Sequence, residues 1–202
     1  KDVDECFANM EISKTAIRNA AMQAETGVTP FAATKVTALL KPSALLSVSR
    51  VIHLFLHTFP EEAIPIYPLG DIPEAEPGDP APVLKRIKVS KFFKDLRSKF
   101  PGLNDSHLQP IVDAADLDKD GYTDYADWYK ATEILWQNEE VIKGFGWDPI
   151  PAEDMDQIKQ GIDLASELAD LASELGVRLM FDAEQTYFQP AIDMTVMQLQ
   201  YK

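Results

Sequence analysis

The chain has 202 residues, of which 46% are hydrophobic, and its 19 Lys and Arg stand against 33 Asp and Glu, giving a formal net charge of −14. A balance this acidic repels phosphate backbones and argues against nucleic-acid binding, and no apolar run approaches the roughly 18 residues of a membrane-spanning helix. The single cysteine, Cys6, excludes a disulfide framework and a cysteine-based zinc site, and suits a reducing compartment.

The first sixty residues predict a helix, a strand and a second helix. Residues 2–24 space their apolar side chains in a loosely helical pattern. Because residue 1 is Lys rather than Met, we expect this helix to begin a processed product or a fragment. Residues 31–40 form a short apolar run with β-branched side chains, typical of a buried strand, and residues 42–59 predict a helix.

The middle of the chain changes composition twice. Residues 60–82 hold seven of the 14 prolines and six acids but no base. This predicts an extended acidic linker, because proline fixes φ and removes a backbone donor. Residues 83–100 predict a basic amphipathic helix that Pro101 and Gly102 end. A packed helix with a solvated basic face is the plainer interpretation, and docking on an acidic neighbour or a membrane surface is the alternative.

The last part of the chain predicts a long helix, a second strand and a terminal helix. Glycines and prolines within residues 144–151 mark a further linker, and residues 153–175 carry one apolar stripe at helical spacing. Residues 177–182 begin with an apolar run that predicts a second buried strand, and Pro190 opens the terminal helix.

Two apolar strands, each followed by a helix, predict parallel βα units and hence an α/β fold. An ordinary crossover between such strands needs about a dozen residues, whereas residues 41–176 separate these two. The sequence therefore predicts an insertion. The expected organisation is a first fold segment, the acidic linker, an inserted helical module and a second fold segment: residues 1–59, 60–82, 83–150 and 151–202.

An acidic loop between two helices predicted within residues 103–136 carries the most specific local motif. Oxygen-bearing residues recur at alternate positions around Gly121, as in the calcium loop of an EF-hand, where a glycine allows a sharp turn. A hard divalent cation takes roughly six to eight oxygens. The candidate ligands, one of which acts through its backbone carbonyl, are Asp116, Asp118, Asp120, Tyr122, Asp124 and Asp127.

Two features distinguish this loop from that of a calcium sensor. Its last ligand position is Asp127 rather than Glu, and the shorter side chain makes bidentate binding harder, which weakens Ca²⁺ and favours Mg²⁺. Thr123 stands where an aliphatic residue is usual, and the sequence shows no second loop of this type. We expect Ca²⁺, with Mg²⁺ as a competitor, at one structural or weakly regulatory site. An acidic surface turn without metal is the alternative.

Three charged residues lie on or beside the predicted strands. Lys35 stands within the first strand in an otherwise uncharged run, and a buried lysine must be paired or lose its proton. Asp182 ends the second strand, at the edge where α/β enzymes place their chemistry, and Glu184 follows it. The cation and the carboxylate could face each other across a pocket. By spacing alone, a snorkelling lysine and a helix-capping acid are the commoner interpretation.

The amino-acid sequences of the two strands resemble those of the eukaryotic proline dehydrogenases, also called proline oxidases. Residues 177–192, VRLMFDAEQTYFQPAI, closely resemble the signature of this family. Residues 31–39, FAATKVTAL, resemble its earlier strand segment, of the form (I/T)K(L/V)(T/S)AL. The two stretches occur in the family's order and are separated by a long insertion, as in the animal and fungal enzymes.

This resemblance implies a flavoenzyme on a distorted (βα)8 barrel, of which residues 1–59 and 151–202 would form early segments. Such an enzyme takes a hydride from the ring carbon beside the nitrogen of L-proline onto FAD and gives pyrroline-5-carboxylate, on the route to glutamate. Its electrons pass to a quinone, and it associates with the matrix side of the inner mitochondrial membrane. The family's flavin-contacting residues would lie beyond residue 202, so we expect this chain alone to be inactive.

Three residues match catalytic positions of the family. Lys35 matches the lysine that helps to hold the substrate carboxylate, Asp182 matches the acid of the DAE motif that orients polar partners, and Glu184 lies in the same motif. Two other functions stay open. A non-catalytic, calcium-binding EF-hand regulatory protein would explain the loop and the acidity but not the strand wording. A structural remnant without a function of its own is the other.

Overall fold

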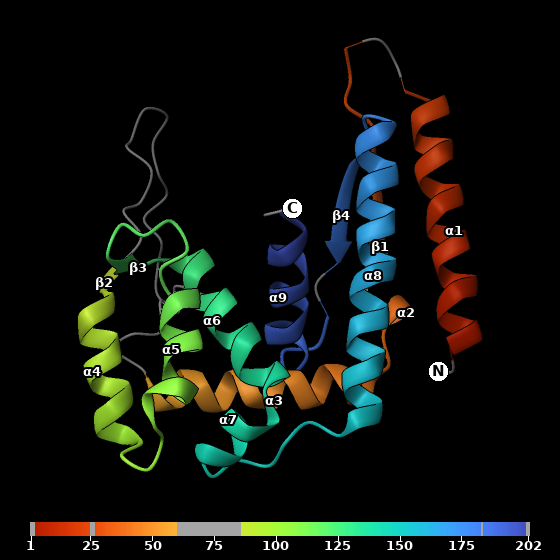
Figure 1. The fold of residues 1–202 in the computed structure, drawn as a ribbon. Coiled ribbons are helices and arrows are strands. Elements are labelled where there is room, and N and C mark those ends of the chain that lie inside the picture. Colours follow the sequence, from red (N-terminus) through yellow and green to blue (C-terminus); the bar gives the residue numbers. More distant parts are fainter. Residues whose placement is uncertain (1–2, 25–26, 60–85, 183, 201–202) are drawn as a thin grey trace. The chain divides into compact units, whose positions relative to one another are not determined.

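The computed structural model describes residues 3–24, 27–59, 86–182 and 184–200 (Figure 1). The chain divides into two compact units: unit 1 comprises Lys1–Ile52 and Ile150–Lys202, and unit 2 comprises His53–Pro149. The predicted acidic linker, residues 60–82, lies outside the described residues. In the described parts of the chain, no helix combines the length and apolar character needed to cross a membrane.

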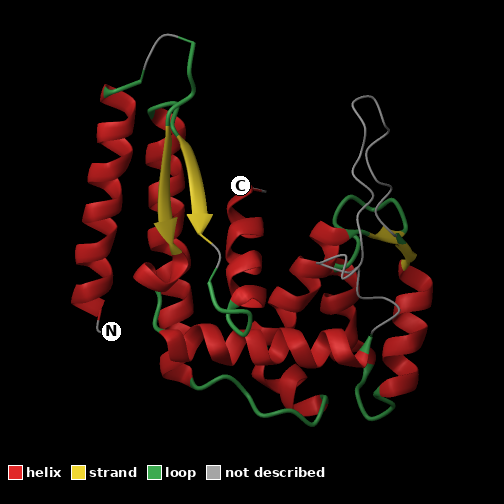
Figure 2. Ribbon diagram, turned by 180° about the vertical axis from the view of Figure 1, so that it is seen from behind, coloured by secondary structure: helices red, strands yellow, loops and turns green. Residues whose placement is uncertain are grey.

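Unit 1 is built on two parallel strands, as the sequence predicts. β1, Phe31–Lys35, pairs with β4, Arg178–Asp182, and the register runs from Phe31 opposite Arg178 to Lys35 opposite Asp182 (Figure 2). The helices of this unit are α1 (Val3–Met22), α2 (Val36–Leu39), the first part of α3 (Pro42–Thr58), α8 (Ala152–Glu174) and α9 (Gln189–Gln200).

Helices cover one face of this strand pair. Ala32 of β1, together with Leu179 and Phe181 of β4, packs into an apolar core with residues of α1 and α8. On the opposite face, Phe31 and Met180 are exposed. The prediction of two buried strands is therefore wrong. Side chains alternate along a strand, and within the described residues helices cover only one face of this pair.

β1 is also shorter than the predicted strand, residues 31–40. It ends at Lys35, and α2 follows at once, closed by the backbone N–H of Leu40, which donates to the carbonyl of Val36 at 3.1 Å. Lys35 therefore lies at the carboxyl end of its strand rather than in the middle. This places it level with the end of β4.

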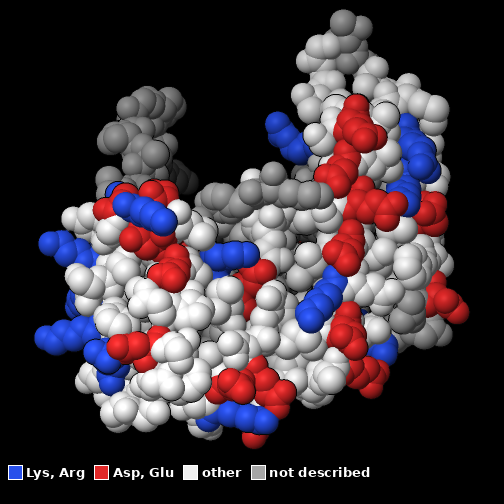
Figure 3. Space-filling view, viewed as in Figure 1, with Lys and Arg blue, Asp and Glu red and all other residues white. Residues whose placement is uncertain are grey.

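α8 has an apolar side and an acidic side, and it confirms the long helix predicted at residues 153–175. Its buried residues recur at helical spacing: Ile158, Gly161, Leu164, Ala165, Leu168 and Ala172. Exposed acids gather along α8 in Figure 3, and one of them, Glu167, accepts from Lys14 Nζ of α1 at 2.6 Å. Gly161 allows a close approach to Leu40, because a Cβ there would overlap that side chain.

Unit 2 is helical around an aromatic core. Its elements are the end of α3, β2 (Ile87–Lys88), α4 (Val89–Lys99), α5 (Asp105–Ala114), β3 (Tyr122–Thr123), α6 (Tyr125–Gln137) and α7 (Glu139–Gly144). In the core, Phe55 stacks on Trp128 with ring centroids 4.7 Å apart, and Phe92 meets the same indole edge-on at 5.8 Å. Trp128 is fully buried.

One helix boundary in unit 2 differs from the sequence predictions, and one helix is additional to them. The helix predicted over residues 83–100 begins only at Val89, because residues 87–88 pair with β3 instead; residues 83–85 lie outside the described residues. α7 was not predicted. The Asn138 side chain caps it by accepting the backbone N–H of Val141 at 3.1 Å.

Candidate functional site

The three charged residues predicted from the strands meet at the carboxyl ends of β1 and β4. Parallel register sets Lys35 directly opposite Asp182. Lys35 Nζ lies 3.5 Å from Asp182 Oδ2 and 3.1 Å from Glu184 Oε1. The structure thus brings together residues that lie far apart in the sequence. One strand supplies a cation, and the end of the other supplies two carboxylates.

Lys35 is paired but not buried. Its side chain and that of Asp182 are each 56% exposed, whereas Glu184 is 18% exposed. The expectation of a buried lysine is therefore wrong, since Lys35 lies on the uncovered face of the strand pair. The pKa of Lys35 is raised, mainly by its hydrogen bond to Glu184 and then by the charge of Glu184, with a smaller effect of Asp182. The group is an ammonium at neutral pH and can attract an anionic ligand.

Two neighbours of Glu184 were not predicted as site residues. Thr37 Oγ1 of α2 donates to Glu184 Oε1 at 2.9 Å, and the backbone N–H of Glu184 donates to Gln189 Oε1 of α9 at 3.3 Å. Thr37 stands in the KVTAL stretch, two residues after Lys35, so the strand wording already contained a signal for it. Gln189 likewise stands in the stretch 177–192 that resembles the family signature, but its contact with Glu184 depends on how the chain turns after β4.

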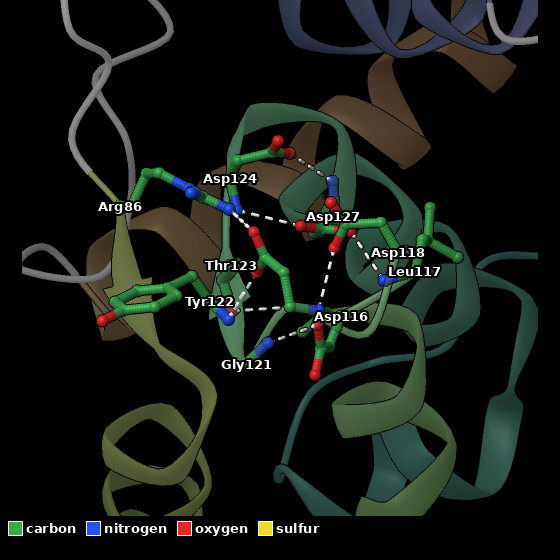
Figure 4. A network of polar contacts seen from close by, with 11 residues as sticks. Arg86, Asp116, Leu117, Asp118, Gly121, Tyr122, Thr123, Asp124 and Asp127 are labelled. Atoms are coloured by element: carbon green, nitrogen blue, oxygen red, sulfur yellow. Dashed lines mark hydrogen bonds and ion pairs between the residues drawn. The ribbon is translucent and has the colours of Figure 1, made fainter.

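In unit 2, the acidic loop joins α5 to α6 (Figure 4). Gly121 has φ 84° and Lys119 has φ 58°, so the chain turns through the left-handed region that glycine adopts readily. One carboxylate oxygen from each of Asp116, Asp118 and Asp120 lies within 4.8 Å of the other two. Three hard oxygen donors so close together fit a Ca²⁺ or Mg²⁺ ion.

Asp124 and Asp127 lie outside that cluster, and their carboxylates accept backbone N–H groups around the start of α6. Asp127 accepts the backbone N–H of Leu117 at 2.8 Å and that of Asp124 at 3.0 Å, while Asp124 accepts the N–H of Asp127 at 3.2 Å. This reciprocal pair is a capping box, which the D-x-x-D spacing could have indicated. Burial raises the pKa of Asp127, which is 4% exposed.

Arg86 adds a cation that the spacing of the loop gave no reason to expect. Its guanidinium forms an ion pair with Asp120 and lies over the ring of Tyr122, 5.1 Å from the centroid. The pairing of β2 with β3 brings the residue there, because Ile87 and Lys88 run antiparallel to Tyr122 and Thr123. Arg86 therefore partly neutralises one of the three clustered carboxylates.

Comparison with known proteins finds mitochondrial proline dehydrogenases among the relatives of this chain. The chain is 27% identical over 208 residues to "Proline dehydrogenase 1, mitochondrial" of Caenorhabditis elegans, covering 98% of this chain and 31% of that protein. The human protein of the same name is 26% identical over 211 residues, covering 98% of this chain and 32% of the relative. The Bos taurus protein is 46% identical over 48 residues, or 24% of this chain and 8% of that protein.

The chain spans about a third of the length of the two longest-matching of these relatives. No family model and no solved structure matches it. The sequence match to the worm and human proteins nevertheless extends over almost every residue, including both strands and the segment between them. The chain is therefore a relative of the mitochondrial proline dehydrogenases along nearly its whole length.

Proposed function

We propose that this chain forms part of an FAD-dependent proline dehydrogenase that oxidises L-proline to pyrroline-5-carboxylate on the route to glutamate. The observation that carries the proposal is the contact of Lys35 with Asp182 and Glu184 at the ends of two adjacent parallel strands. Bound FAD would supply the redox chemistry, taking a hydride from the ring carbon beside the proline nitrogen, with the electrons passing on to a quinone. We assign none of the described residues to the flavin.

The residues of this chain would hold and orient the substrate. Lys35 would form an ion pair with the proline carboxylate, which fixes one end of a small ligand. Glu184 and Asp182 would keep the ammonium charged and in place until that carboxylate arrives. Because the Lys35 side chain is half-exposed, an incoming anion can reach it without unfolding the strand ends.

The same proposal gives the chain an architecture and a location. β1 and β4, with α1 and α8 on one face, would be early units of a distorted (βα)8 barrel whose interior is the uncovered face of the strands. Segments 1–59 and 151–202 would belong to the barrel, and segment 83–150 would be the insertion. The names of the relatives support a mitochondrial location, which we propose to be the matrix side of the inner membrane.

Kinetics of the full-length enzyme test this assignment. Lys35→Ala removes the proposed carboxylate partner, so the KM for proline should rise about tenfold or more, as expected for loss of a charge-assisted contact. Lys41→Ala is the matched control, because Lys41 Nζ also pairs with a carboxylate of unit 1, Glu153, at 2.9 Å. An unchanged KM in Lys35→Ala would exclude the role of Lys35. Absence of proline oxidation by the unmodified enzyme would exclude the function.

We also propose that the loop of unit 2 binds Ca²⁺, with Mg²⁺ as a weaker competitor. The close grouping of the Asp116, Asp118 and Asp120 carboxylates supports this. The backbone carbonyl of Tyr122, with Asp124 and Asp127, would complete the ligand set. A non-catalytic calcium-binding regulatory protein is the alternative function, and it would be favoured by a calcium response without any proline oxidation.

Thermal unfolding of the chain with Ca²⁺, Mg²⁺ or a chelator tests the metal site. A ligand at a hundred times its Kd stabilises a protein by about 2.7 kcal/mol, so a rise in Tm with Ca²⁺ is the expected result. Asp116→Ala should abolish the rise. Asp113→Ala is the matched control, because this exposed acid of α5 lies outside the loop. A calcium effect that persists in Asp116→Ala would place the ion elsewhere.

A further inference from the structure

Glu184 contacts three elements at the strand ends. Its Oε1 lies 3.1 Å from Nζ of Lys35, at the end of β1, and it also accepts a hydrogen bond of 2.9 Å from Oγ1 of Thr37 in α2. Its backbone N–H donates to Gln189 Oε1 at the start of α9. Asp182, in contrast, is as exposed as Lys35 itself, so Glu184 is the more firmly held of the two carboxylates.

We infer that Thr37 is a positioning residue for Lys35: its hydroxyl holds the Glu184 carboxylate, which in turn fixes the ammonium that meets the substrate carboxylate. This inference rests on the proposed function for its catalytic meaning. The contact geometry supports it, since one oxygen atom receives both donors and the hydroxyl therefore limits where the ammonium can lie. Threonine suits the task because its β-branched side chain has few χ1 states.

Gln189 holds the backbone of Glu184. Its Oε1 accepts the Glu184 N–H, while its Nε2 donates to Asp193 Oδ1 at 2.7 Å, one helical turn further along α9. The second bond fixes which way the amide of Gln189 points. Glu184 is thus held through its backbone by Gln189 and through its side chain by Thr37, and Lys35 is held through Glu184.

Acylation of Lys35 in the 202-residue chain tests the arrangement without any need for turnover. Only the neutral amine reacts with acetic anhydride, so the rate at a fixed pH reports how strongly Glu184 retains the ammonium. Thr37→Val should raise the Lys35 rate up to about fivefold, the effect of losing one ordinary hydrogen bond. Thr37→Ser, which keeps the hydroxyl, should restore the original rate. Lys41, paired with Glu153, is the internal reference in each sample.

The same measurement in a Glu184→Ala background decides whether Thr37 acts through Glu184. Glu184→Ala should itself raise the Lys35 rate, and adding Thr37→Val should then change nothing. An unchanged rate in the single Thr37→Val variant would overturn the inference. So would an equal Thr37→Val effect in both backgrounds, because Thr37 would then act on Lys35 by another route.

Steady-state kinetics of the full-length enzyme test whether Thr37 positions Lys35 for substrate binding. Thr37→Val should raise the KM for proline about fivefold with a smaller change in kcat, and Thr37→Ser should reverse it. A lower kcat with unchanged KM would overturn the positioning role. If the unmodified enzyme does not oxidise proline, the proposed function fails, while the acylation series still decides whether Thr37 holds Lys35 through Glu184.

Discussion

The two charged sites of this chain are assembled in opposite ways. In unit 2, the loop gathers Asp116, Asp118 and Asp120 from one short stretch of sequence. In unit 1, Lys35 meets Asp182 and Glu184 only because two distant strands pair in parallel register. The loop consequently carries an excess of negative charge, even with Arg86 paired to Asp120, and is suited to a cation. The strand ends form a nearly balanced group whose lysine can exchange one carboxylate for another.

The cores below the two sites also differ. Unit 1 packs aliphatic and small side chains of α1 and α8 against the strands, as at Ala165, Leu168 and Ala172. Unit 2 packs aromatic rings, with Trp128, Phe55 and Phe92 all in contact with one another. Small residues allow helices to approach closely, whereas large rings fill space between helices that stand further apart. Substitutions in the two cores should therefore destabilise the protein for different reasons.

The largest effect should come from removing the central ring of unit 2. Trp128→Ala should lower the free energy of unfolding of this unit by about 3–5 kcal/mol, because it removes a fully buried indole and leaves a cavity. Hydrogen exchange should show the loss of protection within residues 86–149. Leu168→Ala, the counterpart in unit 1, should instead weaken α1 and α8. Equal loss in both units from either variant would contradict two separate cores.

A smaller effect should come from overfilling unit 1. Gly161→Ala would normally favour a helix by about 1 kcal/mol, but here the new Cβ would overlap the buried Leu40 side chain. We expect a net loss of about 1–3 kcal/mol in denaturant unfolding. Asp163→Ala, at an exposed position of the same helix, should change stability by less than about 0.5 kcal/mol. Stabilisation by Gly161→Ala would show that the contact is not tight.

The difference between the two sites also explains what the sequence could predict. The loop, α8 and the acid at the end of β4 follow from local spacing and were found. The pairing of distant strands is not local. Their positions suggested that a lysine and a strand-end carboxylate could face each other, and the family resemblance matched Lys35, Asp182 and Glu184 to catalytic positions. The contacts of Thr37 and Gln189 with Glu184 became visible only once β1, α2 and α9 were placed together. The prediction that both strands are buried was wrong for the same reason, since composition does not reveal that one face of a strand pair is exposed.

A still smaller effect concerns the charged contact between α1 and α8. Hydrogen bonds to Glu167 and then to Glu11 raise the pKa of Lys14. A raised pKa in the folded state means that this contribution is complete below the ordinary lysine pKa and is lost as the pH rises through the raised value. The free energy of unfolding should therefore fall at alkaline pH by up to about 1 kcal/mol more in the unmodified chain than in Lys14→Met. Identical alkaline profiles would show that the contact contributes nothing.

The smallest expected effect tests the charge contrast itself. Arg86 pairs with Asp120, so an ion bound at the loop must compete with a guanidinium that is already there. Arg86→Gln should tighten Ca²⁺ binding, measured by calorimetry, by up to about fivefold, the equivalent of an exposed ion pair of about 1 kcal/mol. Lys119→Gln removes the same charge from within the loop and is the matched control.

A larger gain in affinity for Ca²⁺ in Arg86→Gln than in Lys119→Gln would identify the contact with Asp120 as the cause. An equal gain in both would mean that only the net charge of the loop matters, and weaker binding in Arg86→Gln would mean that the guanidinium holds the loop in its binding conformation.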